Sequence, residues 1–202
     1  MTRWLPAAIA VLSLTGCAHL PVGSDDLSND ARRAALATVA AWDMRGRLAV
    51  DAGGRGFSGS FDWQQRAAAL DLNVRGPLGA GVLHVAGTPS SMTFTARGET
   101  RTLTDPESEL SALLGWWLPV GSLHAWLLGL TDPLFPASAE NGADGTLAAF
   151  EQRQWRAVFP TYQLETLPGR PPGVLVPRRI DLTHGELKLR LTIDEWRPAT
   201  SP

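Results

Sequence analysis

The sequence predicts a mainly β domain with a helical lid, and two features carry this prediction. Beyond residue 43, short runs alternate apolar and polar residues, the pattern of strands with one buried and one solvent-exposed face. Among these runs lies the stretch Gly115–Gly129, which is rich in tryptophan and has His124 as its only ionisable side chain. A helix that is apolar nearly all round is normally buried. This stretch is therefore predicted to lie as a plug or lid inside a curved sheet.

Length and charge limit the possible functions. At 202 residues the chain is long enough for one domain with a sizeable core. The net charge is -2 and the basic residues form no stripe along the sequence, which argues against nucleic acid as a partner. Lys188 is the only lysine and no Gly-rich loop precedes it, so the P-loop that would hold ATP phosphates is missing. We expect no cofactor, a monomer, and no ATP bound at a P-loop in any transport role.

The N-terminus indicates export and lipidation. A positive start precedes an apolar run over Trp4–Leu14, which is too short to span a bilayer but suits a secretory signal. The run leads into Leu14-Thr15-Gly16-Cys17, which resembles the lipobox of bacterial lipoproteins. That resemblance implies that residues 1–16 are a signal peptide and that Cys17 is lipidated. Ala18, rather than aspartate, follows the cysteine, which implies sorting to the outer membrane. An ordinary signal peptide with a stray cysteine stays the alternative.

A tether is predicted to separate this lipid anchor from the domain. Residues 17–30 form the predicted lipidated N-terminus and tether, because they hold Pro21, Gly23 and polar residues with little to bury. A coil of about 13 residues spans roughly 20 Å on average and roughly 43 Å at full stretch. Residues 31–202 are predicted to be a single domain without an internal repeat. Its first element is a predicted short helix over Ala31–Ala41.

The runs after this helix are predicted to be antiparallel strands, because every second residue is apolar. Turns are expected at Gly53–Gly54 and Gly76–Gly79, and a hairpin that turns at His184–Gly185 closes the chain. Further strands are expected at 150–152 and 155–162. The residues predicted to share the buried face are Met44, Leu48 and Val50; Phe57, Gly59, Phe61 and Trp63; Leu70, Leu72 and Val74; Leu83 and Val85; Met92 and Phe94; Ile180 and Leu182; and Leu187, Leu189, Leu191 and Ile193.

Two helices joined at a proline are predicted in the middle of the chain. Asp105 and Pro106 open the first with a good N-cap residue and a proline in the first turn, and it is expected to run to about Trp117. Pro119 forces a break, and a second helix follows as far as Gly129. The pair is therefore expected to be hinged.

Two later stretches are predicted to be loops. Thr131–Gly145 is rich in Pro, Ala, Asn and Gly and is interpreted as a mobile loop. Pro168–Gly173 carries three prolines and two glycines and is predicted to interrupt the strands as a second loop.

Enzyme signatures are mostly absent, so we expect neither catalytic residues nor a bound metal. The four histidines lack metal-ligand spacing. The run Gly56–Ser60 misses the G-x-S-x-G nucleophile elbow, because Ser60 stands where glycine is needed. His84, within a strand, and His124, within the apolar helix, are interpreted as structural. A hydrolase would require a polar dyad that meets in space, which stays an open alternative at this point.

Apolar surface is what the chain has in excess, and two interpretations of it remain. The strands and helices could simply fill a core, as stripes of Trp and Phe at strand spacing usually do. They could instead line a ligand cavity. Lipidation shifts the balance towards the cavity, because it places the domain beside acyl chains.

Several motifs spread along the chain resemble one family, the LolB outer-membrane lipoprotein receptors. They cover nearly the whole chain beyond the predicted signal peptide, and the block from Gly115 to Gly129 is the most specific. Pro168–Gly173 fits no part of the pattern. The matching residues are Trp42 with Gly46-Arg47-Leu48; Gly59, Phe61 and Trp63-Gln64; Gly76-Pro77-Leu78-Gly79; Gly115-Trp116, Leu118-Pro119-Val120, Leu123, Trp126-Leu127 and Gly129; and Ile193-Asp194 with Trp196.

The resemblance implies an open, incomplete antiparallel β-barrel covered by short α-helices around an apolar cavity. It implies that the protein is anchored in the outer membrane and faces the periplasm. There it would accept lipoproteins from the periplasmic carrier LolA and insert them into the inner leaflet, with Leu78 touching the membrane. The residues expected to line the acyl-chain cavity are Leu48, Val50, Phe61, Trp63, Leu72, Phe94, Trp116, Trp117, Trp126, Leu127, Leu189 and Leu191.

Two other functions remain open from the sequence. One is a structural outer-membrane lipoprotein, whose interior would be filled. The other is a lipid-modifying hydrolase, whose cavity would contain a polar dyad. The volume of the interior cavity and the side chains that line it distinguish all three.

Overall fold

The computed structural model describes residues 29–167 and 170–199, so the predicted signal peptide, Cys17 and most of the tether lie outside it. One antiparallel sheet of eleven strands dominates the described chain, in the order β6-β5-β4-β3-β2-β1-β11-β10-β9-β8-β7. The sheet is open, and β6 and β7 form its two edges. The strands are β1 Ala41–Ala52, β2 Arg55–Arg66, β3 Ala69–Arg75, β4 Gly81–Thr88, β5 Ser91–Ala96, β6 Glu99–Leu103, β7 Ala137–Asn141, β8 Leu147–Gln152, β9 Trp155–Leu167, β10 Arg170–His184 and β11 Leu187–Pro198.

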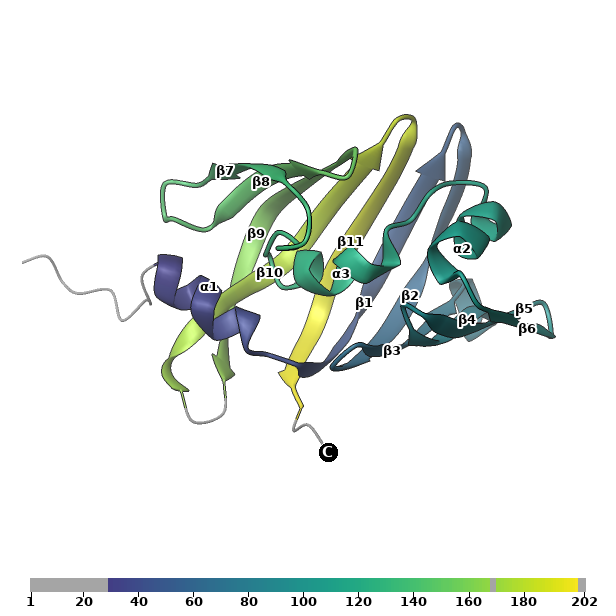
Figure 1. The fold of residues 1–202 in the computed structure, drawn as a ribbon, viewed down its shortest axis with the longest axis horizontal. Coiled ribbons are helices and arrows are strands. Elements are labelled where there is room, and N and C mark those ends of the chain that lie inside the picture. Colours follow the sequence, from purple (N-terminus) through teal and green to yellow (C-terminus); the bar gives the residue numbers. More distant parts are fainter. Residues whose placement is uncertain (1–28, 168–169, 200–202) are drawn as a thin grey trace, which may run out of the picture.

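Three α-helices accompany this sheet: α1 Asn29–Ala37, α2 Pro106–Leu114 and α3 Val120–Leu127. Figure 1 shows the sheet curving into a half-barrel, with α2 and α3 lying inside the curve and α1 at one side. A 3₁₀ turn, η1 Pro77–Gly79, joins β3 to β4. The predicted fold, a mainly β open barrel with a helical lid, is confirmed.

Two glycines permit close approach where the middle of the sheet curls. A Cβ atom on Gly46 would lie 2.1 Å from the Thr192 carbonyl oxygen, and one on Gly59 would lie 2.1 Å from the Arg75 carbonyl oxygen. A register shift between Arg45 and Gly46 occurs in the pairing of β1 with β11. Bulges bend and twist a strand locally. These features therefore favour the bend that turns a flat sheet into a half-barrel.

The first lid helix begins where predicted but ends earlier. Its start is not capped by the Asp105 side chain. Instead, Glu109 reaches back and accepts hydrogen bonds from the backbone N–H groups of Thr104 and Asp105, at 2.7 and 2.9 Å. The helix ends at Leu114 rather than Trp117, because Gly115 adopts a left-handed conformation with φ 80°.

The N-terminal helix also differs from its predicted bounds. It ends at Ala37 rather than Ala41, because Ala41 already begins β1, where it pairs with Arg66 at the end of β2. Helix α1 packs on β10. Its Arg32 side chain is buried, and Nε donates a hydrogen bond to the Leu175 carbonyl oxygen at 2.7 Å.

Sequence patterns missed both edge strands. The predicted loop Thr131–Gly145 contains β7, whose five residues are all exposed and show no apolar alternation. Strand β6 has the sequence ETRTL, in which only Leu103 is buried. The predicted loop Pro168–Gly173 was also too long, because β10 already begins at Arg170. Edge strands exposed on both faces carry too little apolar signal to be recognised.

One side of the half-barrel is tightly filled with aromatic rings. We define the packed half as β8, β9 and the adjoining face of α3. The Trp126 ring centroid lies 5.4 Å from that of Phe150 and 6.3 Å from that of Trp155. Trp126 donates a hydrogen bond from Nε1 to Gln152 Oε1 at 2.8 Å. All four side chains are almost completely buried.

Candidate apolar binding cavity

An apolar cavity of about 270 Å³ lies between the lid helices and the inner face of the sheet. Its volume is near the lower end of the range for small-molecule sites, roughly 300–1,000 Å³. The lining side chains are all Leu, Val, Phe or Trp. They are Leu48, Val50, Phe57, Phe61, Trp63, Leu70, Leu72, Val74, Val82, Leu83, Val85, Phe94, Leu110, Leu114, Trp116, Leu118, Val120, Leu123, Leu127, Leu182, Leu189 and Leu191.

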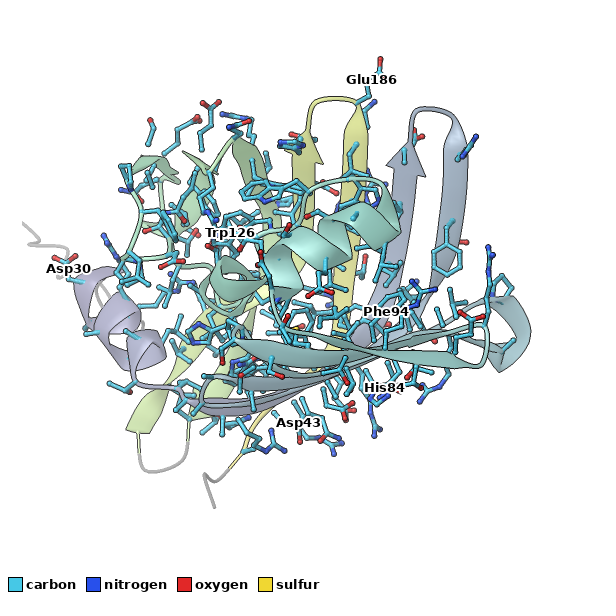
Figure 2. All side chains as sticks on the ribbon, turned by 45° about the vertical axis from the view of Figure 1, so that its right-hand side comes forward. Asp30, Asp43, His84, Phe94, Trp126 and Glu186 are labelled. Carbon is cyan, nitrogen blue, oxygen red and sulfur yellow. The ribbon has the colours of Figure 1, made fainter. Side chains whose placement is uncertain are left out.

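The strand register explains how residues distant in sequence meet in this lining. Leu48 on β1 lies opposite Leu191 on β11. Val50 lies opposite Leu189 on one side and Phe57 on the other. Because directly paired residues in an antiparallel sheet point to the same face, these pairs form a continuous apolar surface. Figure 2 shows Phe94 on this inner side, beneath the helices, and His84 and Asp43 on the outer side.

Helix α3 divides its apolar residues between the cavity and the packed half. Val120, Leu123 and Leu127, spaced by three and four residues, line the cavity. Ser122 and Trp126, which are also four residues apart, face the other way towards Asp132 and Gln152. The same short helix therefore forms one wall of the cavity and completes the filled core.

Most of the predicted cavity residues do line this cavity. Their contact with acyl chains remains a prediction, but the structure brings them together as expected. Two of the predicted residues, Trp117 and Trp126, lie elsewhere. The ten that line the cavity are Leu48, Val50, Phe61, Trp63, Leu72, Phe94, Trp116, Leu127, Leu189 and Leu191.

Trp126 and Trp117 are corrections to the predicted lining. Trp126 lies on the face of α3 that turns away from the cavity, where its indole N–H is satisfied by Gln152. Trp117 follows the break after α2 and packs its ring on His184, with centroids 5.8 Å apart. The guanidinium carbon of Arg153 lies 4.9 Å from the Trp117 ring centroid. Both tryptophans thus belong to the packed side of the lid.

Some lining residues were not named as cavity residues from the sequence. Phe57, Leu70, Val74, Leu83 and Val85 line the cavity from the strand face that is predicted to be buried. On α2, a spacing of four residues places two leucines on the cavity side, a signal that the helical period could have revealed. The further lining residues are Val82, Leu110, Leu114, Leu118, Val120, Leu123 and Leu182.

An ion pair ties the first lid helix to the packed half. Arg153, in the β8–β9 turn, pairs with Glu107 on α2, and both side chains are mostly buried. The Arg153 Nη1 group also lies 3.3 Å from Ser122 Oγ on α3. One guanidinium therefore connects the two lid helices to the rim of the sheet.

Polar groups lie around the cavity rather than in it. Burial lowers the pKa of His124 on α3, and the nearby Asp132 carboxylate opposes this shift. On the outer face, His84 Nε2 lies 3.1 Å from Asp71 Oδ2. Within residues 29–167 and 170–199, no cluster of three or more His, Cys, Asp or Glu residues could hold a metal ion. None of the helices that the structure describes has the length and hydropathy to cross a membrane.

The predicted membrane-contacting residue, Leu78, lies in η1 between β3 and β4. Hydrogen bonds from Gly76 N to Ala80 O at 2.8 Å and from Gly79 N to Gly76 O at 3.1 Å close this connection. The side chain of Leu78 and the predicted lipidation site Cys17 lie outside the described parts of the molecule.

An open antiparallel half-barrel that holds an all-apolar cavity under two helices defines a class of protein suited to binding apolar ligands. Comparison with known sequences identifies the family within this class. The family model described as "Outer membrane lipoprotein LolB" matches residues 40–196. The chain therefore belongs to the LolB family.

Relatives in three bacteria match over nearly the whole chain. The outer-membrane lipoprotein LolB of Halorhodospira halophila is 32% identical over 201 residues, covering 96% of each chain. That of Stutzerimonas stutzeri is 31% identical, covering 96% of this chain and 95% of its own. That of Pseudomonas aeruginosa PAO1 is 30% identical, covering 97% of this chain and 96% of its own.

Solved structures share the fold at low sequence identity. A LolA superfamily protein from Nitrosomonas europaea aligns with a TM-score of 0.55 at 6% identity, over 87% of this chain and 96% of its own. A DUF1329 family protein from Desulfovibrio piger aligns with a TM-score of 0.52 at 9% identity, over 86% of this chain and 92% of its own. These similarities support the half-barrel architecture.

Proposed function

We propose that this chain is an outer-membrane lipoprotein, facing the periplasm, that takes lipoproteins from the carrier LolA and inserts them into the inner leaflet. It would hold their acyl chains in the apolar cavity and would not use ATP. The observation that carries this proposal is the cavity itself, whose 22 lining residues are all apolar. Membership of the LolB family, whose members are named outer-membrane lipoproteins, supports the location and the class of cargo.

The cavity also weighs on the two alternatives. A purely structural lipoprotein would need no interior space, whereas about 270 Å³ is left between lid and sheet. A lipid-modifying hydrolase would need a polar dyad where the acyl chain lies. The residues that line the cavity include no such dyad.

The energetics favour a transfer that runs downhill without nucleotide hydrolysis. An acyl chain of about 14 methylenes gains about 0.8 kcal/mol each, or about 11 kcal/mol in total before ordering costs, on leaving water. Transfer between two apolar hosts needs only a small difference, because about 1.4 kcal/mol gives a tenfold bias. A series of increasing affinity from carrier to receptor to bilayer is therefore sufficient to drive delivery.

Two further positions complete the proposal. Cys17 would be the mature N-terminus and the lipid anchor, so radioactive palmitate should label the wild type and leave Cys17→Ala unlabelled. Leu78 would touch the membrane during insertion. Leu78→Glu should then melt like the wild type and accept cargo, but fail to release it into liposomes.

Transfer of a fluorescent lipoprotein from LolA to liposomes tests the function. We expect this protein to accelerate transfer, and we expect Phe94→Glu, which places a charge in the cavity, to abolish acceptance of the cargo. Thr93→Glu is the matched control, because it adds the same charge to the opposite, exposed face of β5. If both variants melt like the wild type and accept cargo equally well, the cavity is not the acyl-chain site.

A further inference from the structure

One loop holds an apolar side chain in solvent. We define the Leu134 tip as residues 133–136, Pro-Leu-Phe-Pro, between α3 and β7. Leu134 is 82% exposed, the highest value for a large hydrophobic residue in the described chain, and Phe135 is 39% exposed. An isolated exposed leucine on a surface is common and needs no explanation. Leu134 is distinguished by the hydrogen bonds that hold the backbone of its loop.

Buried polar residues fix the backbone of the Leu134 tip. Asp132 Oδ1 accepts a hydrogen bond from the Leu134 backbone N–H at 2.9 Å. Ser122 Oγ donates to Asp132 Oδ2 at 2.7 Å. Gln152 donates from Nε2 to the carbonyl oxygens of Asp132 and Phe135, both at 2.8 Å. Ser122, Asp132 and Gln152 are all buried. This network holds the tip in one conformation that projects Leu134 outwards.

The Leu134 tip lies at a defined end of the sheet. Ala137, which follows it, pairs with Gln152 beside the β8–β9 turn. Along the ladder, this turn lies at the same end as the turns at Gly53–Gly54 and Gly185–Glu186, which stand at the top of Figure 1. Strands β1 and β3 run in the same direction, because both pair antiparallel with β2. The turn η1, which follows β3, therefore lies at the same end of the strands as these turns.

The chemistry of the surroundings favours a lipid surface over a protein partner. A stable protein interface usually buries about 800 Å² per partner, whereas the tip is a small apolar point followed by the exposed strand β7. Behind the tip, the Arg153 guanidinium carbon lies 4.1 Å from the Phe135 ring centroid. Arg153 is mostly buried and paired with Glu107, so it braces the tip from behind and does not itself face solvent. The exposed Leu134 alone supplies the short apolar point that can enter the acyl region of a bilayer.

We propose that the Leu134 tip inserts into the phospholipid bilayer as a membrane contact separate from Leu78. Contacts from both Leu78 and the Leu134 tip, at one end of the sheet, would fix how the half-barrel is oriented relative to the leaflet. This inference rests on the proposed function, because the bilayer is where cargo is to be delivered. Its test is nevertheless independent of cargo.

The direct test measures the depth of residue 134 in a membrane. A polarity-sensitive fluorophore is attached to Leu134→Cys in the full chain reconstituted into phosphatidylethanolamine/phosphatidylglycerol liposomes, and the lipids carry a quencher near the headgroup. We expect a blue shift and loss of most of the emission. The wild-type chain, treated identically, gives the background from its single native cysteine.

Leu164→Cys is the matched control. Leu164 is also an exposed leucine, at 60%, but it lies on β9 near the opposite end of the strands, where it pairs with Leu175. We expect its label to stay unquenched. Equal quenching at both positions, or a label at position 134 that stays in water, would overturn the proposal.

A transfer assay separates this inference from the proposed function. Leu134→Glu should melt at the wild-type temperature, because the side chain is in solvent, and should accept cargo from LolA normally. Its delivery of cargo to liposomes should slow about tenfold, the ratio that corresponds to about 1.4 kcal/mol. Unchanged delivery would count against the tip, whereas failure of the wild type to accept cargo would count against the proposed function alone.

Discussion

The two sides of the half-barrel are built from similar residues but filled differently. In the packed half, Trp126, Phe150 and Trp155 interlock and Gln152 satisfies the buried indole N–H of Trp126. Beneath α2, the leucines, valines and phenylalanines of β1–β5 surround open space. The difference teaches that apolar composition alone does not determine whether an interior is a core or a cavity. Rings that contact one another fill the packed half, whereas the Leu, Val, Phe and Trp side chains that line the cavity leave a space between them.

The largest expected effect is the loss of an interlocking ring. Trp126→Ala should destabilise the fold by about 3–5 kcal/mol, because it leaves a void that the packed half cannot close. Phe94→Ala, at the edge of the existing cavity, should cost only about 1–2 kcal/mol, because that ring already borders empty space. Chemical denaturation of both variants measures the contrast. Equal losses would mean that the cavity side is packed as tightly as the other.

Adding volume should produce the same ranking, with the packed half again the more sensitive. Ala157→Leu, in the filled interior, should destabilise the fold by about 1–3 kcal/mol through overpacking. Leu72→Trp should cost less, because the cavity has room for the larger ring, and should reduce the affinity for acyl chains. Thermal melting together with displacement of a fluorescent fatty acid would measure both effects. A lower stability of Leu72→Trp than of Ala157→Leu would contradict the presence of spare room in the cavity.

These contrasts also show what the sequence could and could not predict. Alternation along β1 and β2 placed Leu48 and Phe61 on the inner face, because a strand has only two faces. Helix α3 is apolar nearly all round, so no periodicity could separate Leu127, in the cavity, from Trp126, in the packed half. Edge strand β7 was missed because both of its faces are exposed.

A smaller effect is expected from the ion pair that joins the two halves. Glu107→Gln removes the charge that partners Arg153, so α2 should be held less firmly. Because both groups are partly exposed to solvent, we expect a loss of only about 1–2 kcal/mol. Exchange of bound fatty acid should become faster.

Asp194→Asn is the control for this ion pair. It removes the partner of Arg47 in an exposed pair on the outer face of the sheet, far from the lid. Its melting temperature and its exchange rate should match the wild type. If Glu107→Gln behaves in the same way, the connection between α2 and the packed half has no role in holding the lid.

The smallest effect concerns pH. Burial lowers the pKa of His124 below its usual value of 6.5, so the unfolded chain binds a proton more readily than the folded one. The stability from neutral His124 is present above pH 6.5 and is lost as the pH falls towards the lowered pKa of the folded state. His124→Gln should flatten the dependence of unfolding free energy on pH in this window. An unchanged slope would show that other groups cause it.

Neighbouring residues on β3 provide the most direct test of the account. Leu72 faces the cavity, whereas Asp71 lies on the outer face beside His84. A photo-crosslinking residue is placed at each position in turn, and the protein is loaded with lipoprotein from LolA before irradiation. We expect capture of the acyl chains from position 72 and none from position 71. Equal capture at both positions, or no capture from position 72, would contradict the claim that the open half of the barrel is the binding site.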